Sequence, residues 1–274
     1  MPDFRSNFGQ LLFATTLLRC KREDDAVELG TAFIFDYELD SETDVPLLVT
    51  CKHVVEGSLE TEFFFTAQKP AEGSAPRQLD LGQRATIKIG KYEDIWFGHP
   101  DKDVDVAVSP LGHVINGFQA QGVDLYWNSL ASALCPRKEH MAMIDFREPI
   151  VFVGYPYGLL DEANLLPLIR SGWTASHVDL CYNRLPGFYV DAHFHPGSSG
   201  SPVMLIDNMF ATDDKTGLSR MFPRHFLLGI AKRTDKAPAG DFEGHEIGLG
   251  FVVTSDMILE TAELFCQKYP PKKK

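Results

Sequence analysis

Residues 191–203 read Asp-Ala-His-Phe-His-Pro-Gly-Ser-Ser-Gly-Ser-Pro-Val, and this stretch carries the strongest indication of fold and chemistry in the chain. It leaves one expected strand, turns tightly through Pro196, Gly197 and Gly200, and enters another strand at Pro202. Such a turn can expose one serine hydroxyl while consecutive backbone N–H groups point into the same small volume. Acyl transfer needs this combination of a nucleophile and preorganised donors for an oxyanion. A plain Gly/Ser/Pro turn has the same composition, so the assignment needs support from elsewhere in the chain.

Two further strand ends supply the partners that a nucleophilic serine needs. Residues 46–57 contain an apolar strand that ends in His53, where a histidine can act as a general base. Residues 103–108 read Asp-Val-Asp-Val-Ala-Val, and a carboxylate at the start of this strand can orient and stabilise an imidazolium. Strand alternation sends Asp103 and Asp105 to the same face, so periodicity alone does not choose between them. The chain order of His, Asp and Ser at three strand ends is that of the chymotrypsin-like architecture.

Most of the remaining chain is typical of short β-strands separated by Gly, Pro, Asp and Asn. One group of strands lies within residues 11–108, a second lies within residues 150–254, and the more polar residues 111–148 connect them. Closing each sheet into a barrel removes its exposed edges. We therefore predict an all-β fold of two antiparallel six-stranded β-barrels and a C-terminal α-helix, at residues 10–125, 146–254 and 255–268.

Composition and charge exclude several classes of protein. Of the 274 residues, 44% are hydrophobic, which excludes a disordered chain. The 38 acidic and 26 basic residues give a formal net charge of −12, which argues against binding to nucleic acid or anionic lipid. The apolar runs are far shorter than the ~20 residues of a membrane span, and no secretory signal is visible. Five dispersed cysteines without a CxxC pair suit reduced thiols, so we expect a cytoplasmic protein that binds neither nucleic acid nor membrane.

Motifs spread over residues 10–265 resemble the trypsin-like serine peptidases and, within them, the HtrA/Deg type. In chain order the similar segments are Gly30–Phe35, Leu48–Val55, Asp105–Val108, Val153–Gly158, Ser171–Thr174, Asp191–Gly200, Gly229–Ile230 and Gly248–Phe251. Each match alone is weak, but several matches in the right order are specific. Three positions near the triad depart from the family pattern, and one of them is Ser198, which replaces the usual Asn or Asp. Lys232 stands where a small residue is usual near the triad, and Ser201 stands where a second glycine is usual.

The resemblance implies a catalytic role for individual residues. Ser199 would be the nucleophile, His53 the general base and Asp105 the carboxylate that orients the base. The backbone N–H groups of Gly197 and Ser199 would form the oxyanion hole.

The resemblance also implies where a substrate binds. The substrate would pair as an extra strand along Leu228, Gly229, Ile230 and Ala231. His193, Phe194 and His195 would line the pocket wall, where the family has small apolar residues, so its aliphatic preference is not expected here. Two alternating histidines with no nearby partner are more often pocket residues than metal ligands, so we expect no metal and no cofactor.

Three functions remain open from the sequence. The leading hypothesis is a serine endopeptidase that cleaves polypeptide substrates through a Ser-His-Asp triad and an acyl-enzyme intermediate. The alternative is a catalytically silent trypsin-like domain that binds peptide or protein as an adaptor, which Lys232 and the lack of a following PDZ domain favour. An esterase with the same triad is a third, weaker hypothesis. Residues 207–222 form a longer excursion than the usual hairpin, and we expect an activating protein partner to act there.

Overall fold

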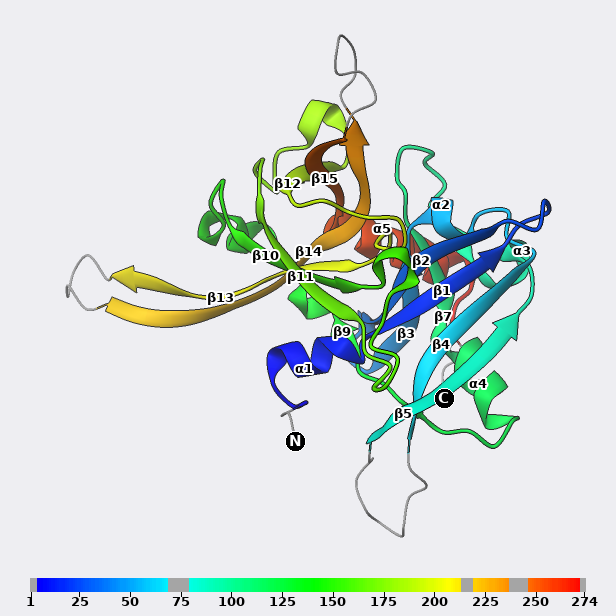
Figure 1. Ribbon diagram of the computed structural model, residues 1–274. Helices are drawn as coiled ribbons and strands as arrows, with labels where there is room; N and C mark the ends of the chain where they lie inside the picture. Colours follow the sequence, from blue (N-terminus) through cyan, green and yellow to red (C-terminus); the bar gives the residue numbers. More distant parts are fainter. Residues whose placement is uncertain (1–3, 69–78, 213–218, 237–245, 272–274) are drawn as a thin grey trace.

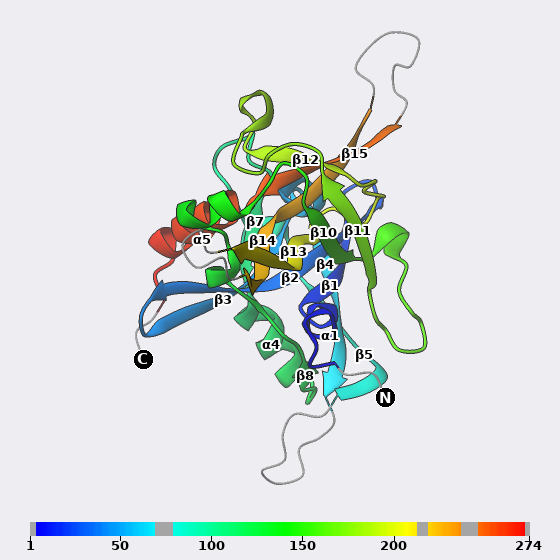
Figure 2. The ribbon, with the colours of Figure 1, turned by 90° about the vertical axis from the view of Figure 1, so that its left-hand side faces the viewer.

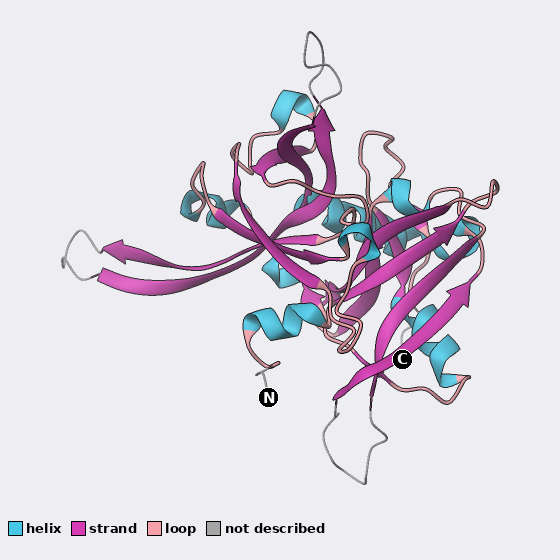
Figure 3. Ribbon diagram, viewed as in Figure 1, coloured by secondary structure: helices cyan, strands magenta, loops and turns pink. Residues whose placement is uncertain are grey.

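The computed structural model describes residues 4–68, 79–212, 219–236 and 246–271 (Figure 1). Strands are the main regular structure of this part of the chain (Figure 3). The strands form two sheets, one from each half of the chain, which confirms the predicted order of two β units followed by a C-terminal helix.

The first sheet holds nine strands. The main path runs β5-β4-β1-β2-β3-β7-β6, with β8 beside β4 and β9 beside β2. Their bounds are β1 Thr15–Lys21, β2 Val27–Asp40, β3 Thr43–Thr50, β4 Glu60–Gln68, β5 Leu79–Ile89, β6 Phe97–Gly98, β7 Ala107–Pro110, β8 Leu125–Tyr126 and β9 Leu130–Ala131. We predicted a closed six-stranded barrel here, but within the described residues the path ends at β5 and β6. The helix α4 (Leu111–Gln119) packs against β5, and its apolar residues Leu111, Val114 and Phe118 are buried.

The second sheet is the predicted closed antiparallel barrel. Its order is β10-β11-β12-β15-β14-β13. The bounds are β10 Pro149–Gly154, β11 Leu168–Thr174, β12 Gly187–Asp191, β13 Pro202–Thr212, β14 Ser219–Lys236 and β15 Glu246–Thr254. Inward-facing side chains such as Phe152, Phe188 and Val252 are almost fully buried and fill the interior.

Strands β13 and β14 continue beyond the barrel as a two-stranded ribbon (Figure 1). The antiparallel register runs without interruption from Asp207 opposite Arg224 to Thr212 opposite Ser219. Most of the excursion that we expected at residues 207–222 is therefore paired strand rather than loop. Residues 213–218 of that stretch lie outside the described residues.

Each of the other helices lies directly before or after a strand in the chain. Their bounds are α1 Asn7–Leu12, α2 Lys52–Val55, α3 Tyr92–Ile95 and α5 Ser255–Lys268, and short 3₁₀ helices lie at Ser132–Leu134, Lys138–Met143, Pro156–Gly158 and Tyr182–Arg184. The helix α5 has the predicted bounds and buries Ile258, Ala262 and Phe265. It contacts β2 and β7 of the first sheet and β14 and β15 of the barrel, along the side where the two units meet (Figure 2). Among the described residues, no helix has the length and apolar character to span a membrane.

One hydrophobic core crosses the boundary between the units. Phe33 and Phe35 of β2 pack in the same cluster as Val153 and Ile230 of the barrel. Residues 30–35 of β2 are buried on both faces, because the sheet core covers one face and the barrel covers the other. This packing brings β2 against the Ser199 turn and so positions the candidate site.

Candidate active site

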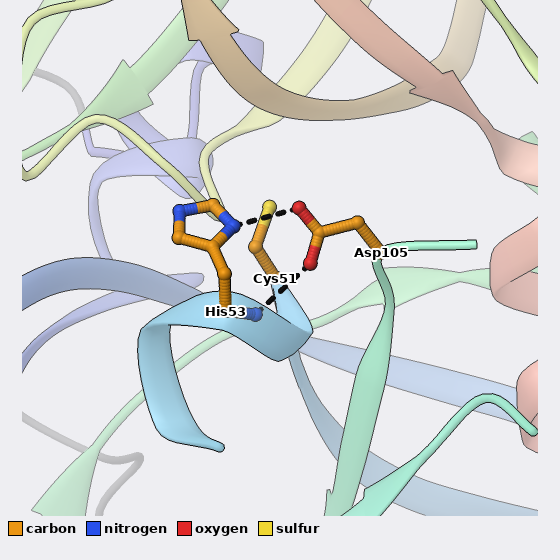
Figure 4. Close-up of side chains that lie close together, drawn as sticks. All are labelled: Cys51, His53 and Asp105. Atoms are coloured by element: carbon orange, nitrogen blue, oxygen red, sulfur yellow. Dashed lines mark hydrogen bonds and ion pairs between the residues drawn. The ribbon is translucent and has the colours of Figure 1, made fainter. Parts of the chain in front are cut away.

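His53 and Asp105 face each other at the end of the first sheet (Figure 4). His53 lies in α2, directly after β3, and Asp105 lies two residues before β7. The two side chains meet because β3 and β7 are paired, with Thr50 opposite Ala107. The Nδ1 atom of His53 lies 2.6 Å from Oδ2 of Asp105, and the His53 backbone N–H donates to Oδ1 at 2.9 Å. Asp103 is exposed, so the structure pairs Asp105 rather than Asp103 with the histidine.

The Asp105 carboxylate is buried, and its charge is balanced by its neighbours. Burial acts to raise the pKa of Asp105, but the hydrogen bonds of His53 and the positive charges of His53 and Lys232 outweigh burial and hold it below its usual range. The side chain of His53 is 43% exposed, so a substrate can reach the imidazole from solvent. A buried, ionised carboxylate behind a partly exposed imidazole is the arrangement that general-base catalysis requires.

Ser199 is the accessible serine of its turn. The side chains of Ser198 and Ser201 are buried, and their hydroxyls have no hydrogen-bond partner among the described residues. Ser199 is partly exposed, and its Oγ donates a hydrogen bond of 2.7 Å to the carbonyl oxygen of Lys232. Within the same described part of the chain, no hydrogen bond joins Ser199 to His53.

The turn around Ser199 needs glycine at two positions. Gly197 and Gly200 have positive φ angles of 87° and 94°. A Cβ atom at Gly200 would collide with the carbonyl oxygen of Thr31, and one at Gly197 would collide with the carbonyl oxygen of Tyr155. Both glycines therefore allow the turn to press against the backbone of neighbouring segments.

The backbone N–H groups of this turn divide into two sets. Ser198 donates to His195 at 2.9 Å, Gly200 donates to Ala231 at 2.8 Å, and Ser201 donates to Ser198 at 3.0 Å. The N–H groups of Gly197 and Ser199 have no acceptor in the part of the chain that the structure describes. They are the two donors that the sequence predicted for the oxyanion hole, and they are available to a ligand.

Contrary to the sequence-based prediction, the structure does not leave residues 228–231 of β14 open to a substrate strand. Strand β14 lies between β13 and β15 along residues 228–231, where Ile230 is opposite both Pro202 and Val253. Both edges are occupied there, so the prediction that a substrate strand pairs with Leu228, Gly229, Ile230 and Ala231 is wrong. From Lys232 to Thr234, the described strands leave β14 paired with β15 alone. Residues 232–234 are therefore the edge at which an extra strand can pair.

The three predicted pocket residues have different environments. Phe194 is only 4% exposed and packs edge-to-face on Phe152 with ring centroids 5.0 Å apart, so it belongs to the barrel core and not to a pocket surface. His193 and His195 are partly exposed, and their ring centroids lie 4.3 Å apart. The ring of Tyr157 lies 5.3 Å from that of His195. These three rings form a polar aromatic group beside the Ser199 turn.

Cys51 lies beneath the histidine and was not singled out from the sequence. Its Sγ, a nitrogen of His53 and an oxygen of Asp105 lie within 4.8 Å of one another (Figure 4). Its thiol donates to the carbonyl oxygen of Ala231 at 3.2 Å, and burial raises the pKa of this thiol well above its ordinary value. A metal ion here would need the thiolate and would break the His53–Asp105 bond, so we assign Cys51 a packing role.

A cavity of about 480 Å³ opens beside His53. Its lining residues are His53, Glu56, Lys102, Asp105, Lys232 and Arg233. The cavity therefore connects the His53–Asp105 pair to Lys232 and Arg233 of β14.

Solved structures show which fold this arrangement belongs to. The chain is similar to an HtrA-type protease, AlgW, solved with a tripeptide, with a TM-score of 0.51 and 16% identity over 97% of this chain and 64% of that chain. It is also similar to HL collagenase, with a TM-score of 0.51 and 13% identity over 96% of both chains. This chain thus spans less than two thirds of the length of the HtrA-type chain. No family model and no curated protein matches the sequence. The likeness establishes the trypsin-like fold and confirms the predicted fold class.

Proposed function

We propose that the chain is a serine endopeptidase that cleaves polypeptides, with Ser199 as nucleophile, His53 as general base and Asp105 as the carboxylate that orients the base. The observation that supports this most is the 2.6 Å contact between His53 Nδ1 and Asp105 Oδ2. A carboxylate accepts this bond from an Nδ1–H group, so the neutral imidazole keeps its lone pair on Nε2. That lone pair is what a serine hydroxyl needs as a proton acceptor.

The proposed reaction has two steps that share the same groups. Ser199 Oγ attacks the peptide carbonyl carbon while its proton passes to His53 Nε2, and the oxyanion accepts hydrogen bonds from the N–H groups of Gly197 and Ser199. The C–N bond then breaks as His53 returns the proton to the leaving amine. Water attacks the acyl-enzyme by the same route and releases the new carboxyl terminus. The Ser199 hydroxyl must first rotate away from the Lys232 carbonyl, to which it donates in this structure.

A fluorophosphonate probe tests the proposal, because it reacts only with an activated serine. Mass spectrometry of the labelled protein should find the probe on Ser199, and Ser199→Ala should remove labelling without a fall in melting temperature. Ser201→Ala is the matched control, since its hydroxyl is buried without a partner among the described residues. Labelling of the Ser199→Ala variant at the wild-type rate would reject the assignment. If Ser199 is the labelled residue, a peptide-library cleavage profile gives the preferred residue before the cut.

A catalytically silent adaptor is the second candidate. The Ser199–Lys232 hydrogen bond favours it, because the hydroxyl is directed away from His53. An adaptor would bind peptides along residues 232–234 and stay unlabelled at every pH.

The activating partner that we predict would contact the ribbon of β13 and β14, where Met221 and Phe222 are 59% and 41% exposed. The cytoplasmic location stays a prediction.

A further inference from the structure

Lys232 contacts two members of the proposed triad. Its carbonyl oxygen accepts the hydrogen bond of the Ser199 hydroxyl at 2.7 Å. Its Nζ lies 3.8 Å from Oδ2 of Asp105, the same oxygen that contacts His53 Nδ1. The side chains of Lys232 and Asp105 are only 19% and 7% exposed, so solvent screens this charge interaction weakly.

The backbone of β14 explains how one residue reaches both partners. Ala231 is opposite Val252 and Arg233 is opposite Phe251, so Lys232 is the extra residue of a β-bulge. A bulge redirects the side chain and carbonyl of its extra residue relative to the regular strand. The residue before it is fixed in place, because Ala231 donates its N–H to Ser201 and accepts one from Gly200. Both contacts of Lys232 therefore follow from the local fold.

Each contact opposes a different requirement of acyl transfer. The carbonyl holds the nucleophile's proton, which must pass to His53. The ammonium competes with the imidazole for the charge of Asp105, and that charge would otherwise stabilise the imidazolium formed when His53 takes the proton.

We propose that Lys232 is a positioning residue that restrains the triad, so that the enzyme has low basal activity. The Lys232 charge also extends the activity to lower pH, compared with a variant that has an uncharged residue at this position. This inference rests on the proposed function. Besides Lys232, the charged or titratable groups around His53 in the described residues are Asp105 behind the ring, Cys51 beneath it, and Glu56, Lys102 and Arg233 around the cavity. The Arg22 guanidinium also lies close, since it donates to the backbone carbonyl of His53 at 2.9 Å. Among the cations in the cavity lining, Lys232 places its Nζ 3.8 Å from Oδ2 of Asp105.

The test removes the ammonium and keeps the stem of the side chain. We expect Lys232→Met to react with a small fluorophosphonate at least about tenfold faster than wild type at pH 8. The acid limb of its rate–pH profile should move up by about one pH unit, which a purely structural role would not cause. Lys102→Met removes a cation from an exposed position of the same cavity and should change the rate less. Lys232→Gln gives the same comparison if the Met variant fails to fold.

The outcomes separate this inference from the proposed function. Faster labelling of the uncharged variants with the shifted acid limb supports the inference. Equal or slower labelling of both variants, while wild type is labelled on Ser199, overturns the inference and leaves the peptidase assignment intact. Absence of labelling in wild type and in both variants overturns the proposed function, and the inference with it.

Discussion

The hydroxyl of Thr31 donates a hydrogen bond of 2.8 Å to the carbonyl oxygen of Gly197, and so joins the first sheet to the turn that carries the candidate nucleophile. The same residue donates its backbone N–H to the carbonyl of Ser199 at 2.8 Å, and its hydroxyl accepts the N–H of Tyr155 at 3.2 Å. Thr31 is fully buried. It therefore fixes the carbonyls of Gly197 and Ser199, whose N–H groups are the proposed oxyanion donors.

Thr31→Val should impair both activity and stability. The substitution keeps the shape of the side chain but leaves the Gly197 carbonyl without its donor. We expect a loss of about 1–3 kcal/mol in the free energy of unfolding from the unsatisfied polar groups. We also expect fluorophosphonate labelling to be slower by about 10–100-fold, because a small displacement of the donors misplaces the oxyanion. Urea denaturation and labelling kinetics measure the two effects.

Thr31→Ser is the control for this prediction. Serine keeps the hydroxyl and loses only a methyl group, so its labelling rate should lie much closer to wild type than that of the valine variant. Equal rates for the serine and valine variants would show that the hydroxyl does not position the turn.

Asp105→Asn should abolish most activity, whereas Asp103→Asn should not. An asparagine at 105 presents the wrong hydrogen-bond partner to His53 Nδ1, and in related chemistry this change lowers turnover by about 10⁴. Asp103 is exposed, and the carboxylate that contacts His53 is that of Asp105, so we expect Asp103 to have no role in orienting the base. Peptide cleavage rates of the two variants at pH 8 provide the measurement. A larger loss in the Asp103 variant would refute the assignment.

The position of a site residue or an element could be predicted from the sequence where a local pattern, such as an apolar strand or a helical apolar face, marks it. His53 and Asp105 each end or begin an apolar strand, and pairing of β3 with β7 brings them together. The second barrel and α5 were predicted from the same kind of signal, strand periodicity and a helical apolar face. Strand alternation gives Asp103 and Asp105 the same face, so periodicity did not choose between them. The family resemblance indicated Asp105, and Asp105 is the residue that contacts His53 in the structure.

Contacts between distant segments could not be predicted in this way. The Thr31–Gly197 bond joins residues 166 positions apart, and no local pattern records it. The occupied edges of residues 228–231 depend on which strands flank β14, which the sequence of β14 does not state. The burial of Phe194 likewise depends on Phe152 of another strand. The unusual Lys232 was visible as a departure from the family pattern, but its bulge was not.

The stabilising effect of Asp105 should disappear in acid. Its pKa is held below that of a free aspartate, about 3.9, so the folded chain favours the charged form. The resulting stability is present above about pH 4 and is lost as the pH falls through the lowered pKa. The gap in unfolding free energy between wild type and Asp105→Asn should therefore be widest near neutral pH and narrow below pH 4. Urea titrations from pH 7 to pH 3 measure this gap, with Asp103→Asn as the control, and a gap that is constant with pH would contradict the prediction.

A buried ion network holds the connector to the ribbon of β13 and β14. The Arg224 guanidinium contacts Glu148 at 2.6 and 2.8 Å and Asp207 at 2.8 and 2.5 Å, and it also donates to the carbonyl of Met143 at 2.6 Å. Arg224 and Glu148 are 6% and 5% exposed. Glu148 accepts a further bond from the N–H of Asp145 at 2.7 Å.

Arg224→Met should therefore destabilise the fold by about 3–5 kcal/mol, because it leaves the Glu148 carboxylate buried without its countercharge. The double variant Arg224→Met/Glu148→Gln removes that charge as well and should recover a large part of the loss. Asp207 is 25% exposed and can turn to water, so Asp207→Asn should cost much less than Arg224→Met. Urea denaturation of the three variants at pH 7 measures these differences. If the double variant is no more stable than Arg224→Met alone, the cost comes from lost packing of the arginine stem and not from the unpaired Glu148 charge.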